Sequence, residues 1–347
     1  MRCLVFGGTG FLGGAIVDAL RSDGHDVAIL TRGQTQPVRA PQSDDRPQAE
    51  HIIADRYEDL SALKDRPFDW VFDTCAYAPA AVETLLTALS GKPHYVLISS
   101  ISAYGSFADS QISETTLPPE ATAEDLHKAA SLPPKDRASA AAYGASYGPL
   151  KYACEQQATA LWGDRVTALR LGLLVGAGDY SDRLTWWVRR LDVARGEEQH
   201  VPIPGPADRS VQMIDVRDVA RFALFCAAQS LPGAWNVTGR PIVLRDLLAE
   251  MADLSGTTPT FAPLDPDTIT QAGIAPWSDL PLMVPPGPAF RHFLNVSTAK
   301  AEAAGLTCRP LRDTLAPLLE WDRARRDTPL KCGLSPEQEA RLLATTQ

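Results

Sequence analysis

The chain has 347 residues, of which 45% are hydrophobic and 22% charged, a composition typical of a globular protein with one large domain or two unequal ones. Its formal net charge at pH 7 is −9. An acidic surface repels phosphate backbones and anionic lipids, so we expect neither nucleic acid nor a membrane as partner.

The N-terminal apolar run is short and is interrupted by Gly7, Gly8 and Gly10, so it does not form the apolar region of a signal peptide. No uncharged apolar stretch of 18 residues occurs elsewhere in the sequence. We therefore expect a cytoplasmic protein. Its 6 cysteines are scattered without a C-x-x-C pair, so the sequence indicates neither a metal site nor a redox pair.

Short apolar runs alternate with amphipathic stretches over the first half of the chain. The expected strands are Cys3–Phe6, Asp26–Leu30, His51–Ala54, Trp70–Phe72, Tyr95–Ser99 and Val166–Leu171. The expected helices are Leu12–Ser22, Leu60–Asp65, Ala80–Leu89 and Tyr147–Trp162. This alternation predicts an α/β fold with a doubly wound parallel Rossmann sheet.

The alternation weakens from about Gly176 onward, and prolines become frequent, as in VPIPGPADRS and LMVPPGPAF. Two ordered stretches follow: VQMIDVRDVARFALFCAA predicts a strand running into a helix, and WNVTG predicts a late strand of the main sheet. We assign 1–178 and about 212–240 to a dinucleotide-binding Rossmann domain. A smaller, discontinuous substrate-side domain takes about 179–211 and 241–330, and 331–347 form a polar, helix-prone tail.

The segment FGGTGFLG places glycines at G-x-x-G-x-x-G spacing between an expected strand and an expected helix. In that pattern the first glycine permits a tight turn, the second lets the backbone approach a pyrophosphate, and the third lets helix and strand pack closely. The alternative is a plain strand-to-helix loop. We expect a dinucleotide with its phosphates at the helix start. The expected contact residues of this loop are Gly7, Thr9, Gly10, Phe11, Leu12 and Gly13.

The end of the second expected strand, AILTRG, indicates which cofactor binds. An acidic residue at this position bonds the ribose 2′-hydroxyl of NAD, but this chain has Thr31, followed by Arg32, whose planar cation suits a 2′-phosphate. We therefore expect NADP(H). NAD(H) is the alternative if Arg32 is a solvated loop residue. Asp55, after the third strand, is a candidate contact of the adenine edge, or else an exposed turn residue.

Tyr147 and Lys151 lie one helical turn apart in YGPLK, on one face of the expected helix. A lysine cation near a phenol stabilises the phenolate and lowers the tyrosine pKa, which makes a competent general acid or base. A tyrosine and lysine that merely share a helix face are the alternative, because this spacing is frequent by chance.

Several blocks in order resemble the extended short-chain dehydrogenase/reductases, also called the NAD-dependent epimerase/dehydratase family. They lie within about residues 1–255 and read FGGTGFLGG, VLISSISAYG, YGPLKYACE, LRLGLLVGAGD and VQMIDVRDVA. The resemblance implies an NAD(P)-dependent enzyme in which Ser100 holds the substrate oxygen and Tyr147 exchanges its proton. By the same resemblance, Lys151 also bonds the nicotinamide ribose.

Some positions depart from the family's pattern. Relatives that dehydrate sugar nucleotides have Asp-Glu directly after the catalytic serine or threonine, where this chain has Ile101 and Ser102, so a dehydratase is disfavoured. The fourth strand is followed by TCAY rather than by His-x-Ala-Ala. The gap between Ser100 and Tyr147 is longer than is common, and we expect its extra segment, LPPEATAEDLHKAASLPPKDRASAA, to form a lid.

Arg209, Trp186 and Trp187 are the substrate-side candidates. By the resemblance, an arginine at the Arg209 position contacts the diphosphate of a sugar nucleotide, and a surface ion pair is the alternative. The tryptophans are candidates for stacking on a substrate ring. Of two consecutive tryptophans, however, one is usually in the core and the other exposed.

The sequence thus predicts an NADP(H)-dependent carbonyl reductase or alcohol dehydrogenase that acts on a small organic molecule as a monomer or homodimer. An epimerase of a sugar or sugar nucleotide, with retained NAD(P), is the first alternative. A non-catalytic protein that senses or binds the cofactor is the second. The fold and the three catalytic candidates do not select a substrate.

Overall fold

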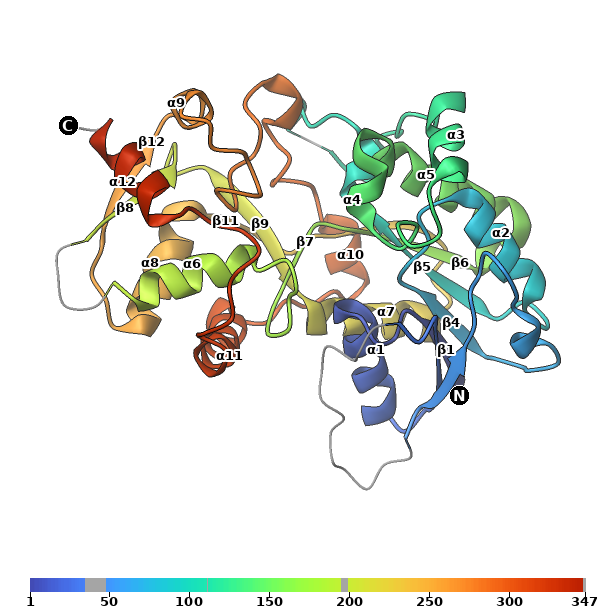
Figure 1. Cartoon of the computed structure of the whole chain (residues 1–347). Helices are drawn as coiled ribbons and strands as arrows, with labels where there is room; N and C mark the ends of the chain where they lie inside the picture. Colours follow the sequence, from blue (N-terminus) through green and yellow to red (C-terminus); the bar gives the residue numbers. More distant parts are fainter. Residues whose placement is uncertain (35–47, 111, 195–198, 346–347) are drawn as a thin grey trace.

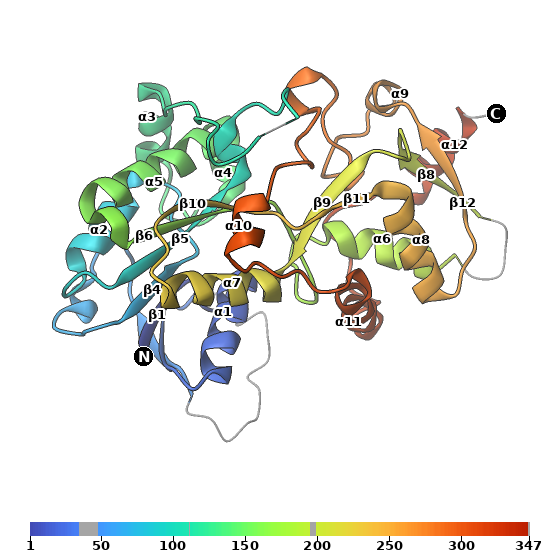
Figure 2. The same cartoon turned by 180° about the vertical axis from the view of Figure 1, so that it is seen from behind.

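The computed structural model describes residues 1–34, 48–110, 112–194 and 199–345, which form two lobes seen from opposite sides in Figures 1 and 2. The first lobe contains a seven-stranded sheet of order β10-β6-β5-β4-β1-β2-β3, with every neighbouring pair parallel. Its strands are β1 (Arg2–Phe6), β2 (Asp26–Thr31), β3 (Glu50–Ile53), β4 (Trp70–Asp73), β5 (His94–Ser100), β6 (Val166–Leu171) and β10 (Gly233–Val237).

Helices cover both faces of this sheet, as the residue alternation along β1 requires. On one face, Cys3 and Val5 pack in one hydrophobic cluster with α1 (Phe11–Ser22) and α7 (Val216–Ala228). On the other, Leu4 and Phe6 pack with α2 (Pro79–Ala88) and α5 (Tyr147–Trp162). All residues of β5 and β6 are buried, as expected for central strands covered on both sides. The predicted doubly wound Rossmann sheet is confirmed.

The strand order reverses beside β1, which has β2 on one side and β4 on the other. In such a sheet the loops after the two central strands diverge and open a crevice at their carboxyl ends. The Thr74 hydroxyl, directly after β4, donates to the Phe6 carbonyl at the end of β1 over 2.7 Å. The glycine-rich loop therefore begins at the edge where ligands of this architecture bind.

The second lobe packs helices against two small sheets of orders β11-β9-β7 and β12-β8. Their strands are β7 (Leu173–Val175), β8 (His200–Pro204), β9 (Ser210–Asp215), β11 (Pro241–Val243) and β12 (Thr260–Leu264). The helices of this half of the chain are α6 (Arg183–Asp192), α8 (Leu244–Ser255), α9 (Pro266–Gln271), α10 (Ala299–Ala304), α11 (Leu311–Ala324) and α12 (Pro336–Ala344). β9 runs directly into α7, which carries the chain back to the main sheet.

The observed elements differ from the sequence-based expectations mainly at their ends. The predicted strand in WNVTG is confirmed as β10, which pairs with β6 at the edge of the main sheet. The predicted helix Leu60–Asp65 is wrong, because only a short 3-10 turn, Ser61–Leu63, forms there. Asp65 has φ +60°, a left-handed conformation that a continuing right-handed helix does not allow.

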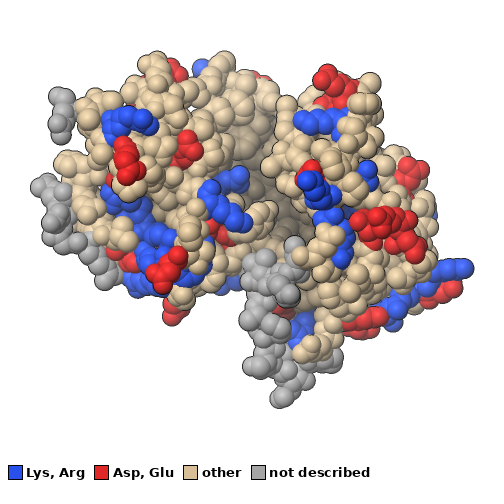
Figure 3. Space-filling model, viewed as in Figure 1, with Lys and Arg blue, Asp and Glu red and all other residues tan. Residues whose placement is uncertain are grey.

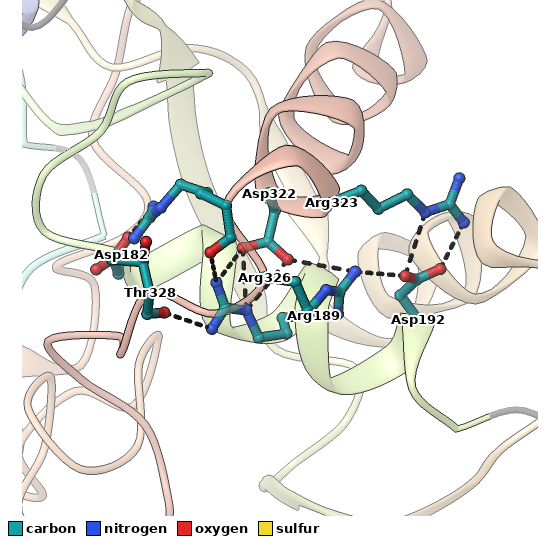
Figure 4. Close-up of polar contacts among 8 residues, drawn as sticks. Asp182, Arg189, Asp192, Asp322, Arg323, Arg326 and Thr328 are labelled. Carbon is teal, nitrogen blue, oxygen red and sulfur yellow. Dashed lines mark hydrogen bonds and ion pairs between the residues drawn. The ribbon is translucent and has the colours of Figure 1, made fainter.

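Ion pairs tie α11 and the segment after it to α6 (Figure 4). The Arg189 guanidinium donates to the Asp322 carboxylate over 2.7 and 3.0 Å. Arg323 and Arg326 both donate to Asp192, over 2.6 and 2.5 Å. Because Asp322 is fully buried, its charge depends on Arg189 and Arg326 for compensation.

We expect Asp322→Ala to lower the free energy of unfolding by about 3–5 kcal/mol, because it leaves the largely buried Arg189 cation without its partner. Urea denaturation measures this difference. Arg240→Ala is the matched control, since Arg240 pairs with Glu302 at an exposed site and its loss should cost less than about 1 kcal/mol. Equal stability of the two variants would show that the ion pairs of Asp322 do not stabilise the fold.

The C-terminal tail packs on the second lobe as far as it is described, to residue 345. A capping box at Ser335 and Gln338 begins α12, and Leu342 is fully buried. Glu339 accepts from the Arg190 side chain of α6 over 2.9 Å. Within the described ranges, no helix is long and apolar enough to cross a membrane.

Candidate active site

The glycine-rich loop leaves little room for side chains where β1 turns into α1. Gly7 has φ +74°, and a Cβ there would lie 2.5 Å from Thr74 Oγ1. A Cβ on Gly13 would lie 2.1 Å from the Gly7 carbonyl oxygen. Gly10, at the N-cap position of α1, has no side chain with which to cap the first amides of the helix. This cradle fits the pyrophosphate of a dinucleotide.

The other loop residues differ in what they offer a cofactor. Phe11 and Leu12 are buried in the cluster between α1, α7 and the sheet. Their side chains serve packing, and they would contact a cofactor through their backbone amides. Thr9 lies in the loop itself and is also buried.

Ser100 and Tyr147 are brought together from two elements. Ser100 ends β5, and Tyr147 begins α5. Burial raises the pKa of Tyr147 above its usual value, and the nearby Ser100 side chain acts in the opposite direction. Gly148 makes this approach possible, since a Cβ there would lie 2.1 Å from the Ser102 carbonyl oxygen. Our sequence reasoning missed this glycine, although it stands next to Tyr147.

Lys151 lies one turn further along α5 and is buried. Its ammonium donates to the carbonyls of Ala76, over 2.7 Å, and Ile98. Burial lowers the pKa of Lys151. Burial of the phenol dominates the pKa of Tyr147 and raises it, so the expectation that Lys151 lowers this pKa stays a prediction.

A buried ion pair supports the loop that follows β4. Arg56 Nη2 lies 2.7 Å from Asp73 Oδ1, and the Tyr95 hydroxyl donates to Asp73 Oδ2 over 2.8 Å. Burial alone would raise the pKa of Asp73, but the Arg56 guanidinium holds it below its usual value. The Cys75 amide also donates to Asp73, over 3.1 Å. Asp73 thereby fixes the loop from which Ala76 contacts Lys151.

The residues expected to select the cofactor lie at the ends of β2 and β3. The Thr31 hydroxyl is 2.7 Å from His51 Nε2 and accepts from the Gly33 amide over 3.1 Å. Arg32 Nη1 donates to the Pro134 carbonyl over 3.0 Å. Asp55 Oδ1 accepts from the Tyr57 amide over 2.9 Å, as in a turn.

The contact of Arg32 with Pro134 connects β2 to the long insert between Ser100 and Tyr147. This insert contains α3 (Ala123–Ser131) and α4 (Ala140–Tyr143), which lie close to α5 (Figure 1). Arg137 lies over the Tyr57 ring at 4.8 Å from its centroid. The insert therefore reaches from α5 to the ends of β2 and β3; its role as a lid stays a prediction.

The substrate-side candidates are more buried than the sequence suggested. Arg209 donates to the carbonyls of Pro204 and Leu282, over 3.2 and 2.6 Å, and burial lowers its pKa to about 10. These backbone partners exclude the alternative of a surface ion pair in this structure, and the diphosphate contact of Arg209 stays a prediction. Trp186 and Trp187 both lie in the core of the second lobe, so the expectation that one of them is exposed is wrong.

Tyr180 is a site residue that the sequence analysis missed. It lies between β7 and α6 and is 62% exposed. Partial desolvation of its phenol raises the pKa of Tyr180, and Asp179 and Tyr147 add smaller contributions. The molecule is hollowed between its two lobes (Figure 3). In the part of the chain that the structure describes, no cluster of histidine, cysteine and acidic residues is suited to a metal ion.

Comparisons with known proteins agree with this architecture. Residues 3–83 match the model of the NAD dependent epimerase/dehydratase family. The 2′-dehydrokanamycin reductase of Streptomyces kanamyceticus is 30% identical over 130 residues, which are 38% of this chain and 36% of that protein. The chloroplast stem-loop binding protein of 41 kDa b of Arabidopsis thaliana is 26% identical over 270 residues, 74% of this chain and 64% of that protein.

Among solved structures, the UDP-N-acetylglucosamine 4-epimerase of Methanobrevibacter ruminantium superimposes with a TM-score of 0.66. It is 18% identical and covers 93% of this chain and 98% of that one, so this likeness shows the fold. This chain spans about a third of the length of the reductase and less than two thirds of the chloroplast protein.

Proposed function

Because this chain belongs to the NAD-dependent epimerase/dehydratase family, with residues 3–83 matching its model, we propose that it is an NADP(H)-dependent oxidoreductase. In our proposal it reduces a small organic carbonyl, or oxidises the corresponding alcohol. The observation that carries the proposal is the placement of Ser100, at the end of β5, beside Tyr147 at the start of α5, one helical turn from the buried Lys151. The curated reductase among its relatives supports the same reaction type.

Each residue of this set has a separate task in the proposed reaction. Bound nicotinamide supplies the hydride that adds to the carbonyl carbon. Ser100 hydrogen-bonds the carbonyl oxygen, and Tyr147 donates its phenolic proton to that oxygen as the negative charge develops. The raised pKa of Tyr147 keeps the phenol protonated before this step, which suits a proton donor. Lys151 stabilises the phenolate that remains until solvent returns the proton.

We further propose NADP(H) as the cofactor, because Thr31 brings no opposing charge and Arg32 lies next to it at the end of β2. A guanidinium has five N–H donors. Its contact with Pro134 uses Nη1, and a 2′-phosphate would be a stronger, charge-assisted acceptor than that carbonyl. Arg32 would then exchange one partner for the other.

Exchanging Thr31→Asp and Arg32→Asn together should weaken NADPH binding by roughly five- to a hundredfold and shift preference toward NADH. The NADPH affinity should also become less dependent on salt. Fluorescence titrations of both cofactors against both proteins measure this. Arg221→Asn is the control, because Arg221 forms an exposed pair with Asp23. Wild-type protein that binds NADH as tightly as NADPH would refute the assignment.

Epimerisation of a sugar or sugar nucleotide is the second candidate, supported by the likeness to a UDP-N-acetylglucosamine 4-epimerase. An epimerase returns the hydride to the same substrate, so its nicotinamide shows no net change. Its first step needs Tyr147 as a base, as does alcohol oxidation by the proposed oxidoreductase, so Tyr147 does not separate the two candidates. We favour the reductase because the 2′-dehydrokanamycin reductase is 30% identical over its matched residues, whereas the epimerase is 18% identical.

A non-catalytic binding role is the third candidate, supported by the similarity to a chloroplast stem-loop binding protein. The net charge of −9 opposes binding to a nucleic-acid backbone. The arrangement of Ser100, Tyr147 and Lys151 also favours catalysis. We propose a small-molecule partner rather than a nucleic acid.

A further inference from the structure

Tyr77 occupies a central position beside the proposed catalytic residues, although neither the motifs nor the proposed mechanism uses it. It follows Ala76 in the loop after β4. Its ring centroid lies 5.1 Å from the Lys151 ammonium nitrogen and 6.2 Å from the ring centroid of Tyr147. The Ala76–Tyr77 pair thus contacts one ammonium group twice, through a carbonyl oxygen and an aromatic ring.

A buried ammonium needs such partners, because it has lost its water. Two backbone carbonyls, those of Ala76 and Ile98, accept hydrogen bonds from Lys151. The face of an aromatic ring is electron-rich and attracts a cation, most strongly where water is excluded. We propose that Tyr77 is a positioning residue of the active site, whose ring holds the Lys151 ammonium against the Ala76 carbonyl.

The ring of Tyr77 is itself in contact with the ring of Tyr143. The two rings stack with centroids 5.5 Å apart and planes 30° apart. Tyr143 is fully buried, ends α4, and donates its hydroxyl proton to the Arg137 carbonyl over 2.9 Å. The long insert therefore supports Lys151 through two consecutive aromatic contacts.

The charged and titratable groups around Lys151 show in which direction the loss of the Tyr77 ring should shift the pKa of Lys151. Besides Tyr77 and Tyr147, the titratable groups that act on Lys151 are those of Cys154 and Glu155 on its own helix and those of Asp73 and Cys75 at the end of β4. Burial lowers the pKa of Lys151, and these neighbours raise it. Removing an aromatic ring that favours the cation should lower the pKa further.

A double-mutant cycle on stability tests the contact without requiring any enzymatic activity. Tyr77→Leu should reduce the folding equilibrium constant at pH 7 about five- to thirtyfold more in the wild type than in a Lys151→Met background. Tyr77→Phe keeps the ring and is the matched control. Its effect on the folding equilibrium constant should be the same in the wild type and in the Lys151→Met background. Urea denaturation measures all six proteins. An equal loss for Tyr77→Leu in both backgrounds would overturn the proposal.

The second test, on catalysis, rests on the proposed function. In the reductive direction, activity should fall as the pH rises and Lys151 loses its proton. This alkaline limb should lie about one pH unit lower in Tyr77→Leu than in the wild type, whereas Tyr77→Phe should restore it. If activity fell at the same alkaline pH in all three proteins, the positioning role would be contradicted. A wild type without turnover would refute the proposed function instead, while the stability cycle would still decide the contact.

Discussion

Substituting Tyr147→Phe should lower turnover by about 10²- to 10⁴-fold and leave cofactor affinity nearly unchanged. The variant removes only the phenolic O–H, which lies near the Ser100 side chain. The ring that lies beside Tyr77 remains. Steady-state rates with NADPH and a carbonyl substrate, together with fluorescence titration of NADPH, measure the two effects separately.

Tyr104→Phe is the matched control for this substitution. The Tyr104 hydroxyl donates to Asn236 Oδ1 over 2.8 Å, so its loss removes a buried hydrogen bond outside the proposed proton path. We expect the control to lose stability by about 1 kcal/mol while keeping its turnover. A Tyr147→Phe protein with most of the wild-type rate would show that another group transfers the proton.

Gly13→Ala should weaken cofactor binding by about a hundredfold or more, because the added methyl group would meet the Gly7 carbonyl oxygen at 2.1 Å. The helix start would have to move away from the loop, and the amide cradle would change shape. Titration of the purified variant with NADPH and NADH gives the loss directly, and circular dichroism shows whether it is folded.

Gly24→Ala is the control for Gly13→Ala. Gly24 has φ +77°, and no atom lies within 4 Å of the Cβ position, so the cost is backbone strain alone, about 1 kcal/mol. This loss should appear in stability and not in cofactor affinity. Unchanged NADPH affinity in Gly13→Ala would contradict a cofactor site at this loop.

The main sheet and its glycine-rich loop could be predicted from sequence because both depend on local patterns. The alternation of Cys3 to Phe6 requires a strand with two buried faces. The spacing of Gly7, Gly10 and Gly13 required a tight turn into a helix. The Tyr147–Trp162 helix was predicted with the observed boundaries for the same reason.

Long-range contacts explain what local patterns could not predict. Trp186 is buried because Gly333, far along the chain, packs against its ring; a Cβ on Gly333 would lie 1.8 Å from Trp186 Cδ1. Arg32 likewise meets Pro134 of the insert, a contact that strand and loop periodicity do not encode. The proximity of Tyr77 to Lys151 depends on how β4 and α5 pack. Only the folded chain reveals these contacts.

The most direct test of the account follows nicotinamide absorbance while the protein is mixed with NADPH and a panel of small ketones and aldehydes, then with NADP⁺ and the alcohols. The proposed oxidoreductase consumes one NADPH for each carbonyl reduced, and Tyr147→Phe does not. Conversion of a sugar or sugar nucleotide to its epimer, with no net change in absorbance, would contradict the reductase assignment.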